Sequence, residues 1–255
     1  MYDDLTRPPL SAAALTRALA PQGWRVEVLG SVDSTNETVA VRAAAGEPGG
    51  LVLVAEQQTS GRGRLDRSWQ SPPRAGLTFS VLLRPVLPRR ALPVSRWGLV
   101  PLLAGTAVAT AVRQQTGLPA ELKWPNDVLV DGRKLCGLLA QVVDDAIVLG
   151  IGLNVSTRAD ELPHEQATSL LLEGAVMDRD TVLRAVLRSL SDVLTGPDAV
   201  DLSGYRELCC SLGRAVRVEL PGGGVREGVA EAVDEHGRLV VDGVAYAAGD
   251  VVHLR

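Results

Sequence analysis

The sequence predicts an α+β fold: a mainly antiparallel sheet with helices packed on it, followed by a small C-terminal β unit. Turn dipeptides separate the apolar runs of residues 122–155, where Asp131-Gly132 and Asp144-Asp145 are typical of antiparallel hairpins. Beyond Gly213 the chain turns into short strand-like runs broken by glycine-containing turns, which suits a small barrel of SH3 size. We therefore expect two units, residues 1–212 and 213–255.

The N-terminal elements follow from capping residues and apolar spacing. Residues 11–20 carry a helical pattern behind Ser11, a residue type that caps helix N-termini. Residues 24–46 predict a strand, a polar turn and a second helix that ends at Gly46. Residues 33–36 (Asp-Ser-Thr-Asn) are all N-cap types, so they belong where the strand gives way to the helix.

The middle and C-terminal elements are read in the same way. Residues 49–58 and 76–85 are rich in strand formers, and Pro85 is expected to stop the second strand. A long helix is expected from residue 97 to residue 116, before Gly117. Further helices are expected over residues 178–194 and 203–212.

Composition excludes several function classes. The formal charge is −4, from 26 basic and 30 acidic side chains, and this weighs against general nucleic-acid binding. Three cysteines without a CxxC pair predict neither a disulfide framework nor a zinc site. The charge-free run from residue 97 to residue 112 is shorter than the roughly 18 residues of a membrane span. With no apolar leader near residue 1, we expect a cytoplasmic protein.

A loop with dense positive charge follows the strand at residues 49–58. It reads TSGRGRLDRSW, with Arg62, Arg64 and Arg67 between Gly61 and Trp69. The guanidinium groups repel one another, so the loop costs stability unless an anion binds there, and arginine forks suit phosphate or carboxylate. Gly61 and the glycine at position 63 are expected to adopt backbone conformations closed to other residues and to let N–H groups approach a ligand.

A second polar stretch, KWPNDVLVDGRKLCG, spans residues 123–137. Asn126 and Asp127 come just before a strand, and Lys134 follows the Asp131-Gly132 turn. Alone, each of these residues is equally well explained as part of a surface turn. Together with the arginine loop, they predict a site for anionic ligands.

The motif order STN, AEQQTSGRGR, W, KWPNDV, RKLCG, GIGLNV and TSL resembles the biotin protein ligases, which attach biotin to carboxylase carrier domains. The resemblance covers residues 31–170 in motif order. It implies a class II synthetase-like catalytic core with a C-terminal SH3-like β-barrel. It also implies ATP and biotin as substrates, with Mg²⁺ carried by the phosphates and no protein ligand assigned to the metal.

The resemblance implies a role for individual residues. The catalytic residues would be Lys134, Arg64 and Asp127, with Asp127 deprotonating the lysine that receives biotin. The biotin pocket would comprise Ser34, Thr35, Asn36, Gln58, Gly61, Arg62 and Gly137. The ATP and adenylate side would comprise Arg64, Arg67, Trp69, Asn126, Lys134 and Asn154. Arg62, Arg64 and Lys134 would together neutralise the carboxylate and the phosphate while these react.

Two positions depart from the family pattern. Asp66 stands where a glycine is common, and it could pair with Arg64 or Arg67 in an empty loop. Cys136 stands where alanine is common, and we assign it no redox role because a small apolar residue suffices there.

The partner implied is the biotin carboxyl carrier domain of an acyl-CoA carboxylase, and the ligase is expected to be a monomer or a weak homodimer. A lipoate ligase-like acyl-adenylate transferase is an alternative, although GRGR and KWPND argue against it. A bifunctional ligase and DNA-binding repressor is the other alternative. It needs a helix-turn-helix, whereas 33 residues precede Ser34 and the first ten are acidic and broken by proline. No nucleic-acid or membrane partner is expected.

Overall fold

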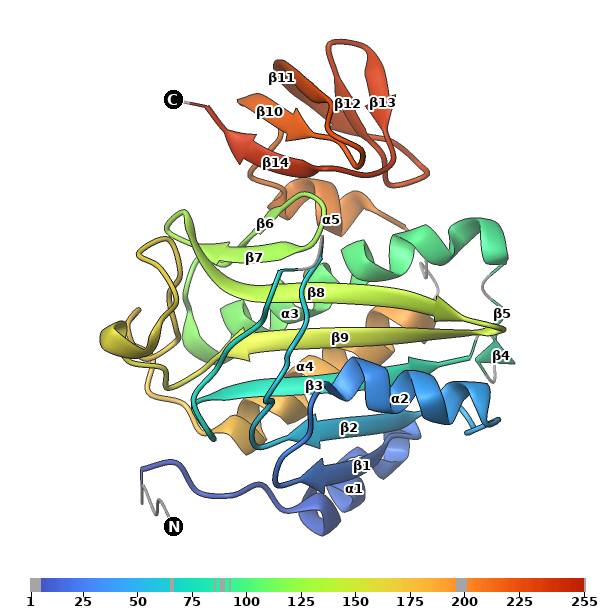
Figure 1. The fold of residues 1–255 in the computed structure, drawn as a ribbon, viewed down its shortest axis with the longest axis vertical. Helices are drawn as coiled ribbons and strands as arrows, with labels where there is room; N and C mark the ends of the chain where they lie inside the picture. The colour runs from blue at the N-terminus through green and yellow to red at the C-terminus, as the bar shows by residue number, and fades with distance from the viewer. Residues whose placement is uncertain are drawn as a thin grey trace.

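The computed structural model describes residues 6–64, 67–84, 86–87, 90–91, 93–195 and 201–254. A seven-stranded sheet in the order β1-β2-β3-β9-β8-β7-β6 forms its centre (Figure 1). The strands are β1 (Arg25–Leu29), β2 (Leu51–Ala55), β3 (Gly76–Leu83), β6 (Glu121–Lys123), β7 (Asp127–Val130), β8 (Arg133–Val143) and β9 (Ala146–Asn154). β1 and β2 are parallel and the other neighbours in this sheet are antiparallel, which confirms the predicted fold class.

The first two helices begin where the capping residues predict. Helix α1 (Ala12–Leu19) starts after Ser11, whose hydroxyl accepts a hydrogen bond from Ala14 N, and its Leu15 and Leu19 are fully buried. Helix α2 (Thr35–Ala44) starts after Ser34, whose hydroxyl accepts from Glu37 N. The polar turn therefore delivers Thr35 and Asn36 to the first turn of α2.

The later helices differ from prediction at their ends. A 3₁₀ turn (Val94–Leu99) precedes α3 (Val100–Thr116), which ends at Gly117 as expected, and α4 spans Arg179–Thr195. Helix α5 (Ser203–Leu208) stops earlier than predicted because the chain becomes extended at Cys209, and Cys210 N donates to Leu122 O at the edge of β6. Among the described helices, none has the length and apolar character needed to cross a membrane.

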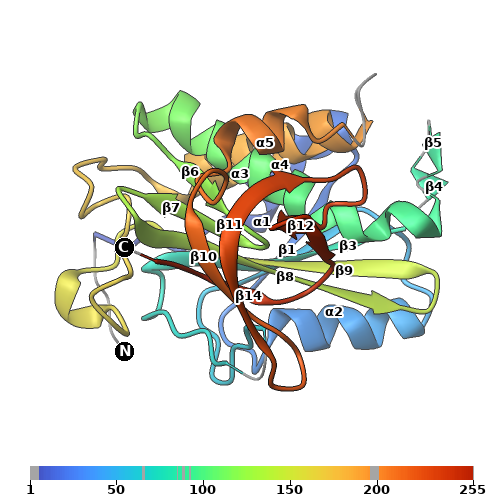
Figure 2. The same ribbon diagram turned by 90° about the horizontal axis from the view of Figure 1, so that it is seen from above.

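Helices cover the two faces of the sheet unequally (Figures 1 and 2). Helices α1, α3 and α4 pack on one face and enclose the main hydrophobic core. Helix α2 covers part of the other face through a small cluster that includes Val39, Ala43 and Val148. The rest of that face, over β7, β8 and β9, is left for polar side chains.

The C-terminal unit is a five-stranded antiparallel sheet in the order β13-β12-β11-β10-β14. Its strands are β10 (Ala215–Glu219), β11 (Val225–Val233), β12 (Leu239–Val241), β13 (Val244–Tyr246) and β14 (Asp250–His253). The predicted small β unit is confirmed, but among the described strands β13 and β14 are not paired, so the sheet is not a closed barrel. It packs on the larger unit, where Trp124 Nε1 donates to Gly237 O at 3.0 Å. The boundary between residues 212 and 213 stays a prediction. Pro85 and the effect ascribed to it lie outside the described residues.

A buried ion pair fixes the segment before α1 to the sheet. Arg179 and Glu56 are 6% and 8% exposed, and Arg179 Nη1 lies 2.6 Å from Glu56 Oε2. Arg179 Nη2 donates to Pro8 O, and Glu56 Oε1 accepts from Leu10 N. The pair therefore links α4, the end of β2 and the N-terminal segment.

Removing one partner of this pair should destabilise the protein. Glu56→Ala leaves the Arg179 charge buried without its carboxylate, and we expect the free energy of unfolding to fall by about 3–5 kcal/mol. The exposed pair Arg217–Glu227 supplies the control, because Glu227→Ala should change stability by about 0.5 kcal/mol or less. Urea unfolding of both variants measures this, and equal effects would contradict the assigned importance of the buried pair.

Candidate active site

A cavity of about 720 Å³ opens on the polar part of the sheet, bounded by the arginine loop and by β14 of the C-terminal sheet. It collects side chains from segments far apart in the sequence. The predicted residues that line it are Ser34, Thr35, Asn36, Gln58, Arg62, Arg64, Arg67, Trp69, Asn126, Asp127, Lys134, Gly137 and Asn154. Gly61 does not line the cavity; it packs behind Gln58.

The described parts of the arginine loop (residues 61–69), which are residues 61–64 and 67–69, pair as the two arms of a small hairpin over the sheet. Trp69 N donates to Gly61 O at 2.8 Å, and Gly63 N donates to Arg67 O at 2.6 Å. Residues 65 and 66 lie outside the described part of the chain, so the ion pairs suggested for Asp66 stay predictions.

The expected reason for two glycines in this loop is wrong. Neither Gly61 nor Gly63 has a positive φ, so neither is in the left-handed region. At Gly61 the constraint is space, because an added Cβ would overlap Trp69 O and the side-chain amide of Gln58. At Gly63 an added Cβ would lie 3.3 Å from Arg67 O. The glycines let the two arms of the hairpin approach each other.

Lys134 reaches the cavity because β8 contains a one-residue bulge. In the pairing of β7 with β8, Val128 lies opposite Cys136 whereas Leu129 lies opposite Lys134, so Leu135 has no partner. Side chains alternate between the faces of a strand, and an extra residue reverses the alternation. Without the bulge, Lys134 would share the buried face of Cys136. With it, Lys134 shares the cavity face.

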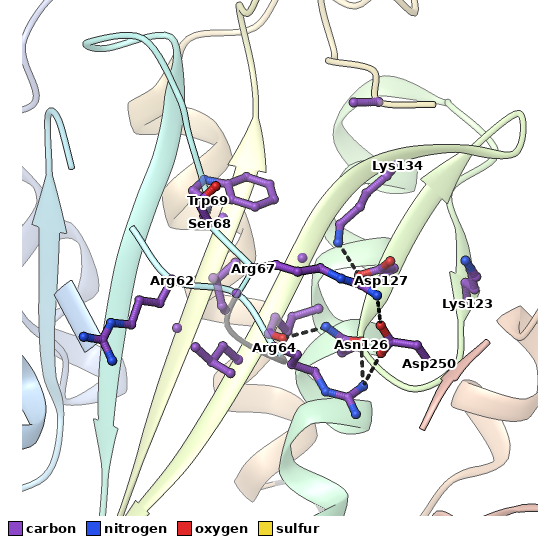
Figure 3. Close-up of a pocket in the computed structure, with 18 of the residues that line it drawn as sticks. Arg62, Arg64, Arg67, Ser68, Trp69, Lys123, Asn126, Asp127, Lys134 and Asp250 are labelled. Atoms are coloured by element: carbon purple, nitrogen blue, oxygen red, sulfur yellow. Dashed lines mark hydrogen bonds and ion pairs between the residues drawn. The ribbon is translucent and has the colours of Figure 1, made fainter. Parts of the chain in front are cut away.

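Lys134 and Asp127 form an ion pair on that face. Lys134 Nζ lies 2.7 Å from Asp127 Oδ1, and the side chains are 31% and 18% exposed (Figure 3). The main chain of Lys134 is also fixed, since its N–H donates to Gln166 O and its carbonyl accepts from Thr168 N. The ammonium group is therefore held at the cavity with its charge balanced.

The loop arginines are balanced by protein groups as well. Arg67 Nη2 lies 2.5 Å from Asp250 Oδ2, and Arg64 Nη1 lies 3.6 Å from Asp250 Oδ1. Arg64 also donates to Asn126 Oδ1 at 3.0 Å and to Gly249 O at 3.3 Å. The charge that was expected to require a bound anion is thus met by a carboxylate of the C-terminal sheet.

Arg62 does not join this cluster. Its guanidinium is 65% exposed and lies 2.6 Å from Glu37 on α2, and Figure 3 shows it directed away from Lys134. The expectation that Arg62, Arg64 and Lys134 form one cationic group is therefore not met in this structure, where Arg64, Arg67 and Lys134 lie on one side and Arg62 on the other.

Glycines of β8 and β9 form a flat floor beneath Trp69. An added Cβ at Gly152 would overlap the indole ring, and one at Gly137 would lie 3.3 Å from Trp69 Cζ3 and 3.2 Å from Lys134 Nζ. Trp69 Nε1 is buried and has no hydrogen-bond acceptor among the described residues. The ring thus lies flat on the strands with one donor unused.

A polar corner lies at the N-terminus of α2. Gln58 Oε1 accepts from Thr35 N at 2.8 Å and from Thr35 Oγ1 at 3.0 Å. Asn36 Nδ2 donates to Leu139 O at 3.3 Å, and its Oδ1 lies 2.6 Å from the hydroxyl of Ser80, which is fully buried on β3. The corner therefore holds side-chain amide and hydroxyl groups in fixed orientations beside the cavity.

The two remaining asparagines fasten strands together. Asn126 donates through Nδ2 to Leu138 O at 2.9 Å while its Oδ1 accepts from Arg64. Asn154 is buried, and its Nδ2 donates to Thr168 O at 2.9 Å. Both line the cavity, so a structural role and contact with a ligand are compatible.

Several cavity residues were not predicted from the sequence, among them Lys123, Gly150, Gly152, Asp250 and His253. Asp250 and His253 come from the C-terminal sheet, which sequence spacing does not place near the loop. Burial, with the nearby charges of Lys123 and Arg214, lowers the pKa of His253 to about 4, so its ring is neutral at neutral pH. Lys123 and Lys134 are the only lysines in the chain, and both line this cavity.

No group of three or more His, Cys, Asp or Glu side chains is placed to hold a metal ion within the described residues. Asp127 and Asp250, the carboxylates nearest the cations, are already paired. Burial raises the pKa of the Cys136 thiol, in accord with the absence of a redox role.

Comparisons with known proteins agree with this geometry. The biotin/lipoate A/B protein ligase family matches residues 28–157, and the biotin protein ligase C-terminal domain matches residues 211–254. The chain is 43% identical to the biotin–[acetyl-CoA-carboxylase] ligase of Mycobacterium tuberculosis over 99% of this chain and 98% of the relative. It is 32% identical to the bifunctional ligase/repressor BirA of Escherichia coli over 86% and 70% of the two chains.

Among solved structures, the biotin protein ligase from Aquifex aeolicus in complex with biotin and ATP is similar, with 31% identity and a TM-score of 0.74. The match covers 90% of this chain and 98% of the Aquifex chain. The resemblance drawn from the order of motifs is confirmed over nearly the whole sequence, and the chain belongs to the biotin protein ligase family.

Proposed function

We propose that this ligase joins biotin to ATP, giving biotinyl-5′-adenylate and pyrophosphate, and then transfers biotin to a lysine of a biotin carboxyl carrier domain. The observation that carries the proposal is the cavity in which Lys134, Arg64 and Arg67 converge beside the polar corner and the Trp69 ring. Within the matched family, GRGR and KWPND and the 43% identical relative favour biotin over lipoate.

In the first step, two anions must come into contact. The biotin carboxylate attacks the α-phosphorus, the bond to the bridging oxygen breaks, and pyrophosphate leaves. Lys134 can leave Asp127, and Arg64 can leave Asn126 and Asp250, to bind the substrate oxygens. The protein contacts, at 2.7–3.6 Å, are hydrogen bonds and ion pairs of the same kind as those that the substrate oxygens would make. A magnesium ion arriving with the nucleotide would supply further neutralisation of charge.

In the second step, the carrier lysine must lose a proton before it attacks the mixed anhydride and AMP leaves. Once Lys134 turns to the substrate, the Asp127 carboxylate is free to accept that proton. The partly exposed position of Asp127 in the cavity is consistent with access from solvent.

The polar corner suits the ureido ring of biotin. Gln58 Nε2 is a donor for the ring carbonyl, and the Thr35 hydroxyl can receive a ring N–H. The Trp69 ring, which lies over Gly137 and Gly152, provides an apolar surface for the adenine ring or the thiophane ring.

We place the reaction in the cytoplasm, in keeping with three free cysteines, and we propose no nucleic-acid partner. The described residues before β1 form one α-helix and a 3₁₀ turn, whereas a helix-turn-helix needs a second α-helix that enters the DNA groove. A monomer or weak homodimer stays a prediction.

The direct experiment is incubation of the protein with biotin, ATP and Mg²⁺, followed by detection of biotinyl-adenylate and of transfer to a biotin carboxyl carrier fragment. Adenylate formation without transfer would contradict the second step alone. Absence of both products would overturn the proposal.

Lys134→Ala should abolish adenylate formation while preserving the fold. The variant removes a partly exposed ammonium group and little packing, and we expect a loss of about 10²–10³-fold in the rate of pyrophosphate release. Arg42→Ala removes an equal charge from an exposed ion pair outside the cavity and should leave the rate unchanged. Release at the wild-type rate in Lys134→Ala would count against the assignment.

Arg64→Ala should loosen the hold on the adenylate. Loss of a charge-assisted contact is expected to raise release of the intermediate about tenfold or more. Self-labelling would report this poorly because both lysines of the chain line the cavity, so a lysine-rich bystander such as serum albumin should be added. If biotinylation stays confined to the carrier fragment, the arginine has another role.

A further inference from the structure

A fully buried serine, Ser80 on β3, lies behind the polar corner and does not line the cavity. Its Oγ is 2.6 Å from Asn36 Oδ1 and 2.8 Å from Thr35 Oγ1. Ser80 is thus the point at which the side chains of two neighbouring α2 residues meet the sheet.

The register of the sheet explains this position. Ser80 pairs with Gly150, and Gly150 pairs with Leu139. The Asn36 amide lies across this row: its oxygen contacts Ser80, its Nδ2 donates to Leu139 O, and an added Cβ at Gly150 would overlap it. Asn36 is therefore clamped to the sheet, and Thr35 is fixed beside it.

Counting protons gives the hydrogen bonds a direction. An amide oxygen only accepts, so the single proton of the Thr35 hydroxyl goes to Gln58 Oε1 at 3.0 Å. The Ser80 hydroxyl is then the donor towards Asn36 Oδ1 at 2.6 Å and Thr35 Oγ1 at 2.8 Å. Ser80 and Gln58 together therefore fix the orientation of the Thr35 hydroxyl.

The direction determines what the corner offers to a ligand. With its proton directed to Gln58, the Thr35 hydroxyl oxygen has a lone pair left for a ligand donor. With its oxygen held by Thr35 N, the Gln58 amide presents Nε2. One acceptor next to one donor matches the adjacent N–H and C=O of a cyclic urea.

We propose that Ser80 is a positioning residue that holds the Thr35 hydroxyl and the Asn36 amide in place and so sets the affinity for biotin. The inference rests on the proposed function, and it adds a residue that does not touch the ligand. Its effect should appear in binding of biotin and not in the chemical step, which takes place at Lys134 and Arg64.

The test is calorimetric titration of biotin into the wild-type protein and four variants: Ser80→Ala, Ser80→Cys, Thr35→Val and the double variant Ser80→Ala/Thr35→Val. Ser80→Ala should raise the Kd for biotin about three- to tenfold. Ser80→Cys should weaken binding similarly, because a thiol fills the space of the hydroxyl but is a weak donor. The kcat for adenylate formation at saturating biotin should stay within about twofold of the wild type.

Each of the following results would contradict one part of the proposal. If Ser80→Cys binds like the wild type while Ser80→Ala does not, Ser80 acts only by filling space. If adding Ser80→Ala to Thr35→Val weakens binding further by the full single-variant factor, Ser80 does not act through Thr35. If Ser80→Ala binds like the wild type, the proposal is wrong. If the wild-type protein itself does not bind biotin, the proposed function fails instead.

Discussion

The site depends on one ion pair and on the irregularity in the sheet that permits it. Lys134 can meet Asp127 because Leu135 bulges out of the β7–β8 pairing and turns the lysine to the cavity face. The bulge lets Leu135 and Cys136, which are adjacent, both face the core. A regular strand would turn Leu135 to the cavity and Lys134 to the core, so the bulge keeps Leu135 buried and brings the ammonium group to the site.

The same balance holds for the rest of the positive charge. Arg64 and Arg67 are held by Asp250 and Asn126, and Arg62 by Glu37. The cluster of cations can therefore exist without a ligand, because carboxylates of the protein itself pair with these side chains until a substrate binds. Substrates must displace these contacts, and partial exposure keeps the cost of displacement low compared with that of a fully buried pair. Since Asp250 comes from β14, the small C-terminal sheet is part of the site.

Much of the fold could be predicted because capping residues, turn dipeptides and apolar runs act locally. Ser11, Ser34 and Gly117 mark helix ends in the structure as in the sequence. The order of motifs indicated which residues gather, and nearly all of them line one cavity. The contributions of Asp250 and Ser80 depend on tertiary placement and on sheet register, which the sequence alone does not determine. The adjacent apolar residues Leu135 and Cys136 did not mark the bulge in the sequence, because Leu138-Leu139 and Val142-Val143 in the same strand are also adjacent apolar pairs.

The central claim is that Lys134 and Arg64 leave their protein partners to hold a carboxylate against a phosphate. A crystal structure of this chain with biotin and a non-hydrolysable ATP analogue tests it most directly. The account predicts Lys134 Nζ and the Arg64 guanidinium within hydrogen-bond distance of the biotin carboxylate or the α-phosphate, with the contacts to Asp127 and Asp250 lengthened. Both ligands bound while Lys134 stays on Asp127 and Arg64 stays on Asn126 would contradict it.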